Sequence, residues 1–395
     1  MSGPLIDANL QTPRPQRFKE PSVIGELESS VQRLVGALES HLDLVGEGAK
    51  IDADDTMNRF TLDAALGCLY KQNNVINMNL GQECAVIKVL AHGYTQVQEN
   101  PVFKLGLIVP SIRKIADYFT LNFFPLGKWR RKVWQIVEHS ARNRLKLIRE
   151  HKMALEENGE CLEGDNLKLR DGIQSEASLT DYIVDQFYAG KISRSELINS
   201  SVFLLGAGHK TPSDMLAFTL YQLARNQHVQ DKVRASIREQ GADSEYLDWV
   251  INESLRLSPP VASGPSRALS AELELAQFPG VVLPVGTFVH IPVYTIHRMP
   301  KYWGADANEF WPERWALRAD FHPCQFMPFG AGLRACLGKE FALFEIRLLL
   351  SSLLSRFRFD CPEPKSDLNE FSAPLTVFIV HKTPIELFVS RVDRN

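Results

Sequence analysis

The stretch that decides the fold runs from Phe326 to Gly338 and reads FMPFGAGLRACLG. It places a cysteine, Cys336, in a glycine-rich loop just before an apolar segment, Phe341–Leu354, that we predict to be helical. Glycine tolerates positive φ angles, so such a loop can turn tightly and approach a flat partner closely. A cysteine at a helix N-terminus is biased toward the thiolate by free N–H groups and the helix dipole. The loop therefore predicts a functional thiol.

Residue chemistry alone leaves three roles open for this thiol: a nucleophile, a zinc ligand or an axial ligand to haem iron. Zinc needs several ligands at suitable spacing, and Cys324, twelve residues before Cys336, is a poor partner. A nucleophile needs a base, and the sequence points to none. A buried structural cysteine is the ordinary alternative. Arg334 adds a positive charge and a guanidinium fork that suits a carboxylate.

The pattern FGxGxRxCxG at residues 329–338 resembles the haem-binding signature of the cytochrome P-450 superfamily at every defined position. The resemblance implies a haem b cofactor with Cys336 as the thiolate ligand of the iron. It also implies that Phe329 packs beneath the haem and that Arg334 pairs with a propionate. Gly330 and Gly338 belong to the same signature.

A second motif lies upstream, where Glu253 and Arg256 are three residues apart on a predicted helix and so share one face. Taken alone, this spacing is common and indicates no more than a surface ion pair. The pair is followed by Pro259-Pro260 and by Phe310–Trp315, which reads FWPERW. In that context it resembles the family's buried Glu–Arg–Arg network. The resemblance implies that Arg314 is the third member and that the network holds the cysteine loop in place.

Arg267 and His297 match positions where the family contacts the haem propionates. Without that resemblance each would be interpreted as an ordinary surface residue.

The stretch Ala207–Pro212 reads AGHKTP and resembles the oxygen-binding segment of the family's central helix. The resemblance implies a catalytic role for Thr211, whose hydroxyl would steady dioxygen and help deliver protons. Pro212 should kink the helix, because it removes a backbone donor and crowds the preceding turn. Lys210 departs from the family, in which an acidic residue normally stands at this position.

The composition is that of an ordinary globular protein: of 395 residues, 45% are hydrophobic and 23% charged. The 44 Lys+Arg against 47 Asp+Glu give a net charge of −3, which argues against nucleic acid as a partner. We find no apolar run that would span a membrane and no secretory signal at the start. Six scattered cysteines without a CxxC pair favour a reducing compartment. We expect an intracellular protein, either cytoplasmic or, by the resemblance, peripheral on the cytosolic face of the endoplasmic reticulum.

Apolar positions three and four apart predict helices over most of residues 23–238, and short β-favouring runs follow Pro259-Pro260. We expect a poorly ordered segment 1–20 and one domain, 21–395, that is mainly α with small β-sheets (α+β). The basic stretch 128–152 is interpreted as a solvated helix face. The family's N-terminal sheet, early helices and Trp-x-x-x-Arg helix have no counterpart here. The resemblance therefore implies a cytochrome P-450 fold that lacks its N-terminal part, an N-terminally truncated member.

The activity that the resemblance implies is that of a haem-thiolate monooxygenase. Such an oxidoreductase inserts one oxygen atom from O2 into a small apolar organic substrate, with electrons from NAD(P)H delivered through a reductase. One alternative is a haem-thiolate isomerase or dehydratase acting on hydroperoxides, which Lys210 favours and Thr211 disfavours. The other is a truncated, non-catalytic member with impaired haem binding.

Overall fold

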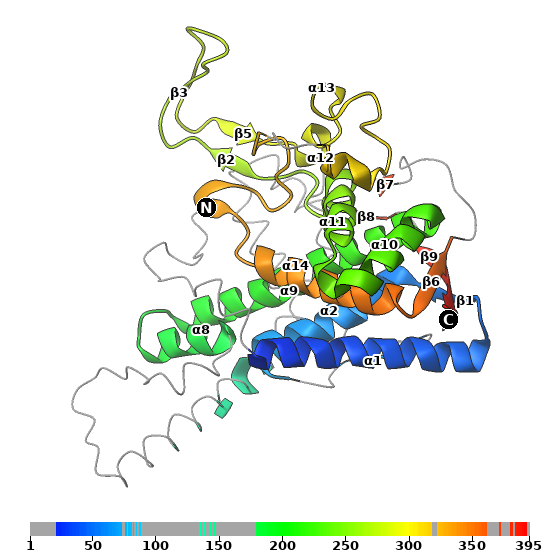
Figure 1. Ribbon diagram of the computed structural model, residues 1–395. Helices are drawn as coiled ribbons and strands as arrows, with labels where there is room; N and C mark the ends of the chain where they lie inside the picture. Colours follow the sequence, from blue (N-terminus) through cyan, green and yellow to red (C-terminus); the bar gives the residue numbers. More distant parts are fainter. Residues whose placement is uncertain are drawn as a thin grey trace. The chain divides into compact units, whose positions relative to one another are not determined.

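The computed structural model describes residues 21–72, 179–317, 322–361 and 384–392, the backbone of 371–372 and 380–381, and scattered positions from 76 to 150. The chain divides into two compact units that alternate along the sequence. Figure 1 labels the helices and strands of the described residues. No helix in the described ranges is long and apolar enough to cross a membrane. The first unit comprises Met1–Gly46, Asp55–Ser213 and Glu340–Glu345, and the second comprises Glu47–Asp54, Asp214–Lys339 and Ile346–Asn395.

The first unit is helical, as the apolar spacing predicted. It contains α1 (Pro21–Val45), most of α2 (Ala53–Tyr70), α8 (Leu179–Tyr188) and the first part of α9 (Arg194–Arg225). The Tyr70 hydroxyl donates a hydrogen bond of 2.5 Å to the Ser201 carbonyl and so ties α2 to α9. Apolar side chains of α2, α8 and α9 form the core of this unit: Leu62, Leu66, Leu69, Val184, Leu197 and Leu205.

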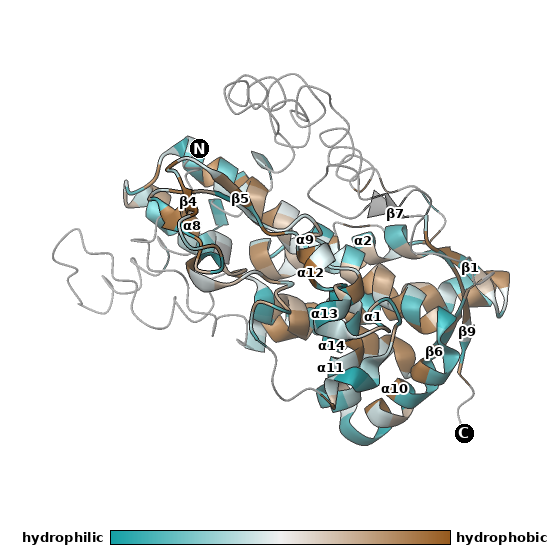
Figure 2. Cartoon of the chain, turned by 90° about the horizontal axis from the view of Figure 1, so that it is seen from above, coloured by the Kyte–Doolittle hydropathy of each residue, from teal (hydrophilic) through white to brown (hydrophobic). Residues whose placement is uncertain are grey.

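The helices of the second unit carry the motifs found in the sequence. Ser244 caps α11, because its hydroxyl accepts a hydrogen bond of 3.1 Å from the Leu247 N–H. In Figure 2 the helices show apolar and polar residues side by side, as amphipathic elements do. These helices are α10 (Gln227–Gln240), η2 (Gly241–Asp243), α11 (Glu245–Leu257), α12 (Val293–Ile296), α13 (Pro300–Trp303), η3 (Pro312–Trp315), η4 (Gly332–Arg334) and α14 (Lys339–Leu354).

The strands of this unit form small antiparallel sheets. The largest has the order β1-β9-β6, from β1 (Ala49–Asp52), β9 (Glu386–Arg391) and β6 (Phe357–Asp360). Leu387 pairs with Ile51, and Val389 pairs with Phe359; all four are buried, so one face packs on the core. The other sheets are the pairs β2 (Ser266–Ala268) with β5 (Phe288–His290), β3 (Leu273–Glu274) with β4 (Val282–Leu283), and β7 (Phe371–Ser372) with β8 (Val380–His381).

The fold class is confirmed: the protein is mainly α with small β-sheets. Strand β1 was missed, because a four-residue segment directly after Gly48 carries too little periodicity to identify it. In the basic stretch 128–152 the described positions agree with the solvated face, since Val137 is buried while Arg142 and Lys146 are exposed. Segment 1–20 lies outside the described residues, and a single domain over 21–395 stays a prediction.

Candidate functional site

The cysteine loop is a compact turn closed by its own backbone. The Met327 carbonyl accepts the Gly330 N–H at 3.0 Å, and the Phe329 carbonyl accepts the Cys336 N–H at 2.8 Å. Gly330 and Gly332 have φ angles of 69° and 68°, which disfavour a side chain at either position. The loop delivers Cys336 to the start of α14 with an exposed side chain.

The electrostatics of Cys336 differ from the sequence expectation. Although the side chain is exposed to solvent, the sulfur lies close enough to the surrounding loop that partial desolvation raises its pKa above the usual value. A hydrogen bond from the Gly338 backbone acts in the opposite direction and is the weaker effect. For the thiol without a bound cation, burial therefore acts against the predicted bias toward a thiolate. A bound metal cation would reverse the balance, because a coordinating thiol is deprotonated.

The surroundings of the thiol fit a flat iron cofactor. A Cβ built on Gly338 would lie 4.0 Å from the Cys336 sulfur, so a side chain there would extend toward the space beside the thiol. Among the described residues no group of three His, Cys, Asp or Glu side chains could hold a metal ion. A single thiol ligand suits haem iron, whose remaining equatorial ligands come from the porphyrin.

Two arginines of the second unit are available for anions. Arg334 lies in η4 and Arg267 in β2; both side chains are exposed, and neither forms an ion pair within the described part of the chain. The Arg267 guanidinium donates only to the Ser266 carbonyl, at 3.0 Å. Both guanidinium groups can therefore bind carboxylates, as predicted for the propionates.

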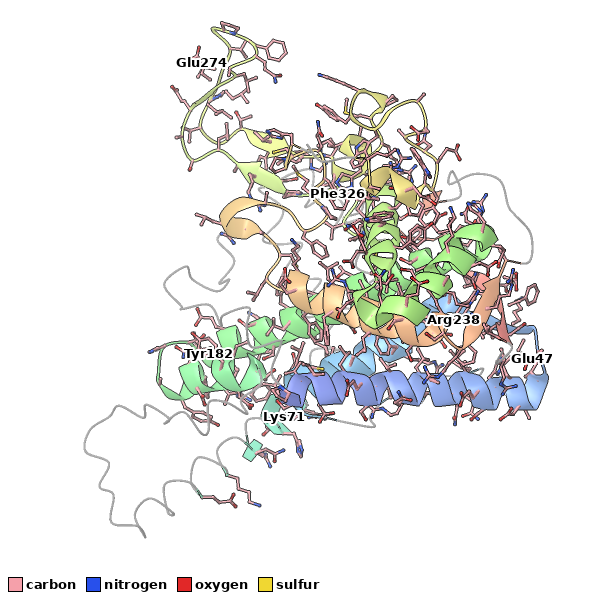
Figure 3. All side chains as sticks on the ribbon, in the orientation of Figure 1. Glu47, Lys71, Tyr182, Arg238, Glu274 and Phe326 are labelled. Atoms are coloured by element: carbon pink, nitrogen blue, oxygen red, sulfur yellow. The ribbon has the colours of Figure 1, made fainter. Side chains whose placement is uncertain are left out.

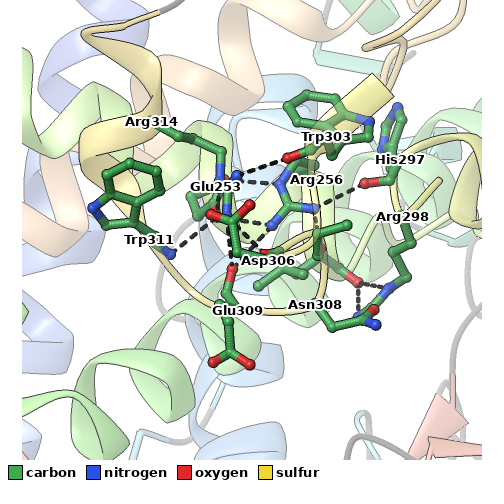
Figure 4. A network of polar contacts seen from close by, with 12 residues as sticks. Glu253, Arg256, His297, Arg298, Trp303, Asp306, Asn308, Glu309, Trp311 and Arg314 are labelled. Atoms are coloured by element: carbon green, nitrogen blue, oxygen red, sulfur yellow. Dashed lines mark hydrogen bonds and ion pairs between the residues drawn. The ribbon is translucent and has the colours of Figure 1, made fainter. Parts of the chain in front are cut away.

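The predicted Glu–Arg–Arg network is present and buried (Figure 4). Arg256 donates to both Glu253 oxygens, at 2.9 and 2.8 Å, and the Arg314 Nε donates to Glu253 Oε1 at 2.8 Å. The three side chains are at most 1% exposed. Because an uncompensated buried charge is very costly, the three groups must fold together.

Two further members of this network were missed by sequence reasoning. The Trp315 indole N–H donates to Glu253 Oε2 at 3.1 Å, and the Asp306 carboxylate lies 3.2 Å from an Arg314 nitrogen. Asp306 supplies the second negative charge for two arginines. Trp315 is visible in the FWPERW motif, but its role follows only from the packing of η3 against α11.

His297 is buried and contacts the cysteine loop. Its side chain is completely buried, and its Nε2 accepts a hydrogen bond of 3.0 Å from the Met327 backbone N–H. Burial lowers the pKa of His297 to about 4, and the charge of Arg256 contributes to this shift. The imidazole is therefore neutral and engaged with the cysteine loop. A contact between His297 and a propionate stays a prediction.

Thr211 belongs to the first unit, on α9, which runs unbroken through Pro212. Its hydroxyl donates to the Ala207 carbonyl at 2.9 Å, one turn earlier. The neighbouring His209 is buried, and burial lowers its pKa to about 4. The predicted kink at Pro212 stays a prediction.

The structure thus combines a glycine-rich cysteine loop before a helix, a buried Glu–Arg–Arg network and a mainly helical fold, the features that the resemblance implied for a haem-thiolate protein. The comparisons give the family. The sequence profile described as cytochrome P-450 matches residues 16–389. The chain belongs to the cytochrome P-450 family.

Individual relatives agree with this assignment. The chain is 31% identical over 308 residues to cytochrome P-450 3A30 of Fundulus heteroclitus, a match over 73% of this chain and 55% of the relative. It is 38% identical over 190 residues to human cytochrome P-450 3A5 and 37% identical over 198 residues to cytokinin hydroxylase of Arabidopsis thaliana. Those two matches cover 45% and 47% of this chain, and each covers 37% of the relative.

The fold is similar to a crystal structure of a cytochrome P-450 (CYP102L1), with a TM-score of 0.68 at 20% identity. This similarity covers 94% of the present chain and 75% of that chain. The chain thus spans only part of the proteins that it matches.

Proposed function

We propose that this chain acts as a haem-thiolate monooxygenase. The observation that carries the proposal is the exposed Cys336 thiol, fixed through its backbone N–H at the start of α14. The printed name of one relative, a hydroxylase, supports the same reaction class. The reaction consumes a substrate C–H bond, O2, NAD(P)H and a proton, and it yields an alcohol, water and NAD(P)+.

Each candidate residue would have a defined task. Cys336 would hold the iron, Phe329 would pack under the ring, and Arg334 and Arg267 would bind the propionates. Haem iron would supply the activation of oxygen. Thr211 would provide a proton-relay hydroxyl, which it can do only by giving up its bond to the Ala207 carbonyl.

The electrons would come from NAD(P)H through a separate reductase, and the substrate would be a small apolar organic molecule. We place the protein inside the cell, in the cytoplasm or peripherally on the cytosolic face of the endoplasmic reticulum. The family membership supports these partners as a class.

The first test is the spectrum of the reduced, CO-bound protein after addition of haem. We expect a thiolate-type Soret band that Cys336→Ser abolishes, whereas Cys324→Ser, an exposed cysteine of the same unit, leaves it unchanged. A thiolate-type band that persists in Cys336→Ser would contradict the assignment. Absence of the band in the wild-type chain would support the non-catalytic alternative.

A second candidate function is isomerisation or dehydration of a hydroperoxide, favoured by Lys210 in place of the usual acid. Turnover of a hydroperoxide without reductase and NADPH, together with no incorporation of 18O2 when both are present, would establish this alternative. Incorporation of 18O into product only with both present supports the monooxygenase.

A further inference from the structure

The start of the cysteine loop is fixed by the buried side chain of His297. Phe326 opens the loop and packs against aromatic rings, with its centroid 5.2 Å from that of His297 and 4.7 Å from that of Trp315 (Phe326 is labelled in Figure 3). The next residue, Met327, donates its backbone N–H to His297 Nε2 at 3.0 Å. The Phe326 ring and the Met327 backbone N–H thus both contact the His297 side chain.

The backbone of His297 is fixed from the other side. Its carbonyl accepts a hydrogen bond of 2.9 Å from the Arg256 guanidinium, which is held by Glu253 (Figure 4). Its N–H donates to the Val293 carbonyl at 2.9 Å. One residue therefore joins the buried ion network to the loop: its main chain belongs to the network and its side chain to the loop.

A short series of hydrogen bonds continues from this point to the thiol residue. The Met327 carbonyl accepts the Gly330 N–H at 3.0 Å, and the Phe329 carbonyl accepts the Cys336 N–H at 2.8 Å. A shift of Met327 would move the turn that carries Phe329, and with it the backbone of Cys336.

We propose that His297 is a positioning residue, whose neutral imidazole sets the position of Cys336 through Met327 and the turn at Gly330. The inference rests on the proposed role of Cys336 as iron ligand. Only a neutral ring with its proton on Nδ1 can accept from the Met327 N–H. Burial and the charges of the nearby Arg256 and Arg298 side chains favour the neutral ring.

The test compares two substitutions in the full chain with haem added. His297→Phe keeps a ring but removes the acceptor, and His297→Gln keeps an acceptor near the Nε2 position. His228→Phe, at an exposed position of α10, is the matched control. We expect His297→Phe to exchange the Met327 amide hydrogen at least tenfold faster and to lose most of the thiolate-type CO band in favour of the thiol type. His297→Gln should restore both signals, and His228→Phe should change neither.

The proposal is overturned if folded His297→Phe shows wild-type amide exchange and a wild-type CO spectrum. Should that variant fail to fold, 15N NMR of the wild-type imidazole decides: a proton on Nε2 overturns the proposal, and a proton on Nδ1 supports it. Amide exchange at Met327 needs no haem. Failure of the chain to bind haem would therefore refute the proposed function but leave the exchange test of His297 in force. Wild-type amide exchange at Met327 together with a thiolate-type CO band in His297→Phe would refute the role of His297 and leave the proposed function standing.

Discussion

At the scale of single residues, two buried glutamates differ in how the cost of burying a carboxylate charge is met. Glu253 accepts hydrogen bonds from Arg256, Arg314, the Trp315 indole and the Trp311 backbone, so its charge is fully compensated. Glu345, in α14, is also completely buried, yet neither of its oxygens has a hydrogen-bond partner within the described residues. Burial raises the pKa of Glu345 well above its usual value. Burial therefore favours the neutral acid form of Glu345.

Replacing Glu345 by glutamine should stabilise the protein. The folded chain ionises Glu345 less readily than the unfolded chain does, so at neutral pH folding carries a cost that Glu345→Gln removes. We expect a gain of at least about 1.4 kcal/mol in the free energy of unfolding at pH 7.5, the equivalent of one pKa unit. Urea denaturation measures this, with the exposed Glu340→Gln of the same helix as control. A loss of stability in Glu345→Gln would show that the carboxylate is ionised in the fold.

At the scale of elements, the connection from α11 to β2 depends on a single glycine. Gly264 has a φ angle of 68°, and a Cβ built there would lie 2.1 Å from the Ile291 carbonyl oxygen and 2.7 Å from a Val293 methyl group. The segment before β2 and the segment after β5 therefore meet backbone to backbone. This close approach positions β2, which carries Arg267, relative to α12.

The substitution Gly264→Ala tests this approach. Its methyl group would strain the φ angle and also collide with backbone, so we expect a loss of more than about 3 kcal/mol, at the upper end of the range for point mutations. Gly280→Ala is the matched control: its φ is 81°, but nothing lies within 4 Å of the added Cβ. It should cost about 1 kcal/mol, from backbone strain alone. Equal losses in thermal or urea unfolding would contradict the predicted collision.

At the scale of the whole molecule, buried titratable groups set the pH dependence of stability. Burial lowers the pKa of His209 in the first unit and of His297 in the second, each to about 4 from 6.5. Between about pH 4 and 6.5 the unfolded chain therefore binds up to two more protons at these sites than the folded chain does. Glu345 acts in the opposite sense above pH 4.5, because the folded chain retains its proton.

The two histidines and Glu345 therefore change stability in opposite directions. The histidines make stability rise with pH between about 4 and 6.5, whereas Glu345 makes stability fall with pH above 4.5. Glu345→Gln should therefore steepen the rise of stability with pH on the acid side and reduce any decline above pH 6.5. Urea denaturation from pH 5 to 8 measures both curves, and identical curves for the wild-type chain and Glu345→Gln would contradict the prediction.

The sequence by itself determined the family, the mainly helical class and three members of the ion network, Glu253, Arg256 and Arg314. FGxGxRxCxG, ExxR and PERW are local patterns, and local patterns are readable because backbone conformation and helix faces depend on neighbouring residues. Helices α1, α2, α9 and α14 were predictable for the same reason. Strand β1 was not, since its pairing with β9 joins residues more than 300 positions apart.

The tertiary structure alone decided the environment of each group. Whether Cys336 is a thiol or a thiolate, whether His297 faces solvent or the loop, and whether Glu345 is charged all depend on desolvation and on partners brought from distant segments. Only the folded structure shows that Asp306 and Trp315 belong to the network. Sequence patterns specify which chemical groups are present, but burial sets the free energy of charging them, and burial exists only once the chain has folded.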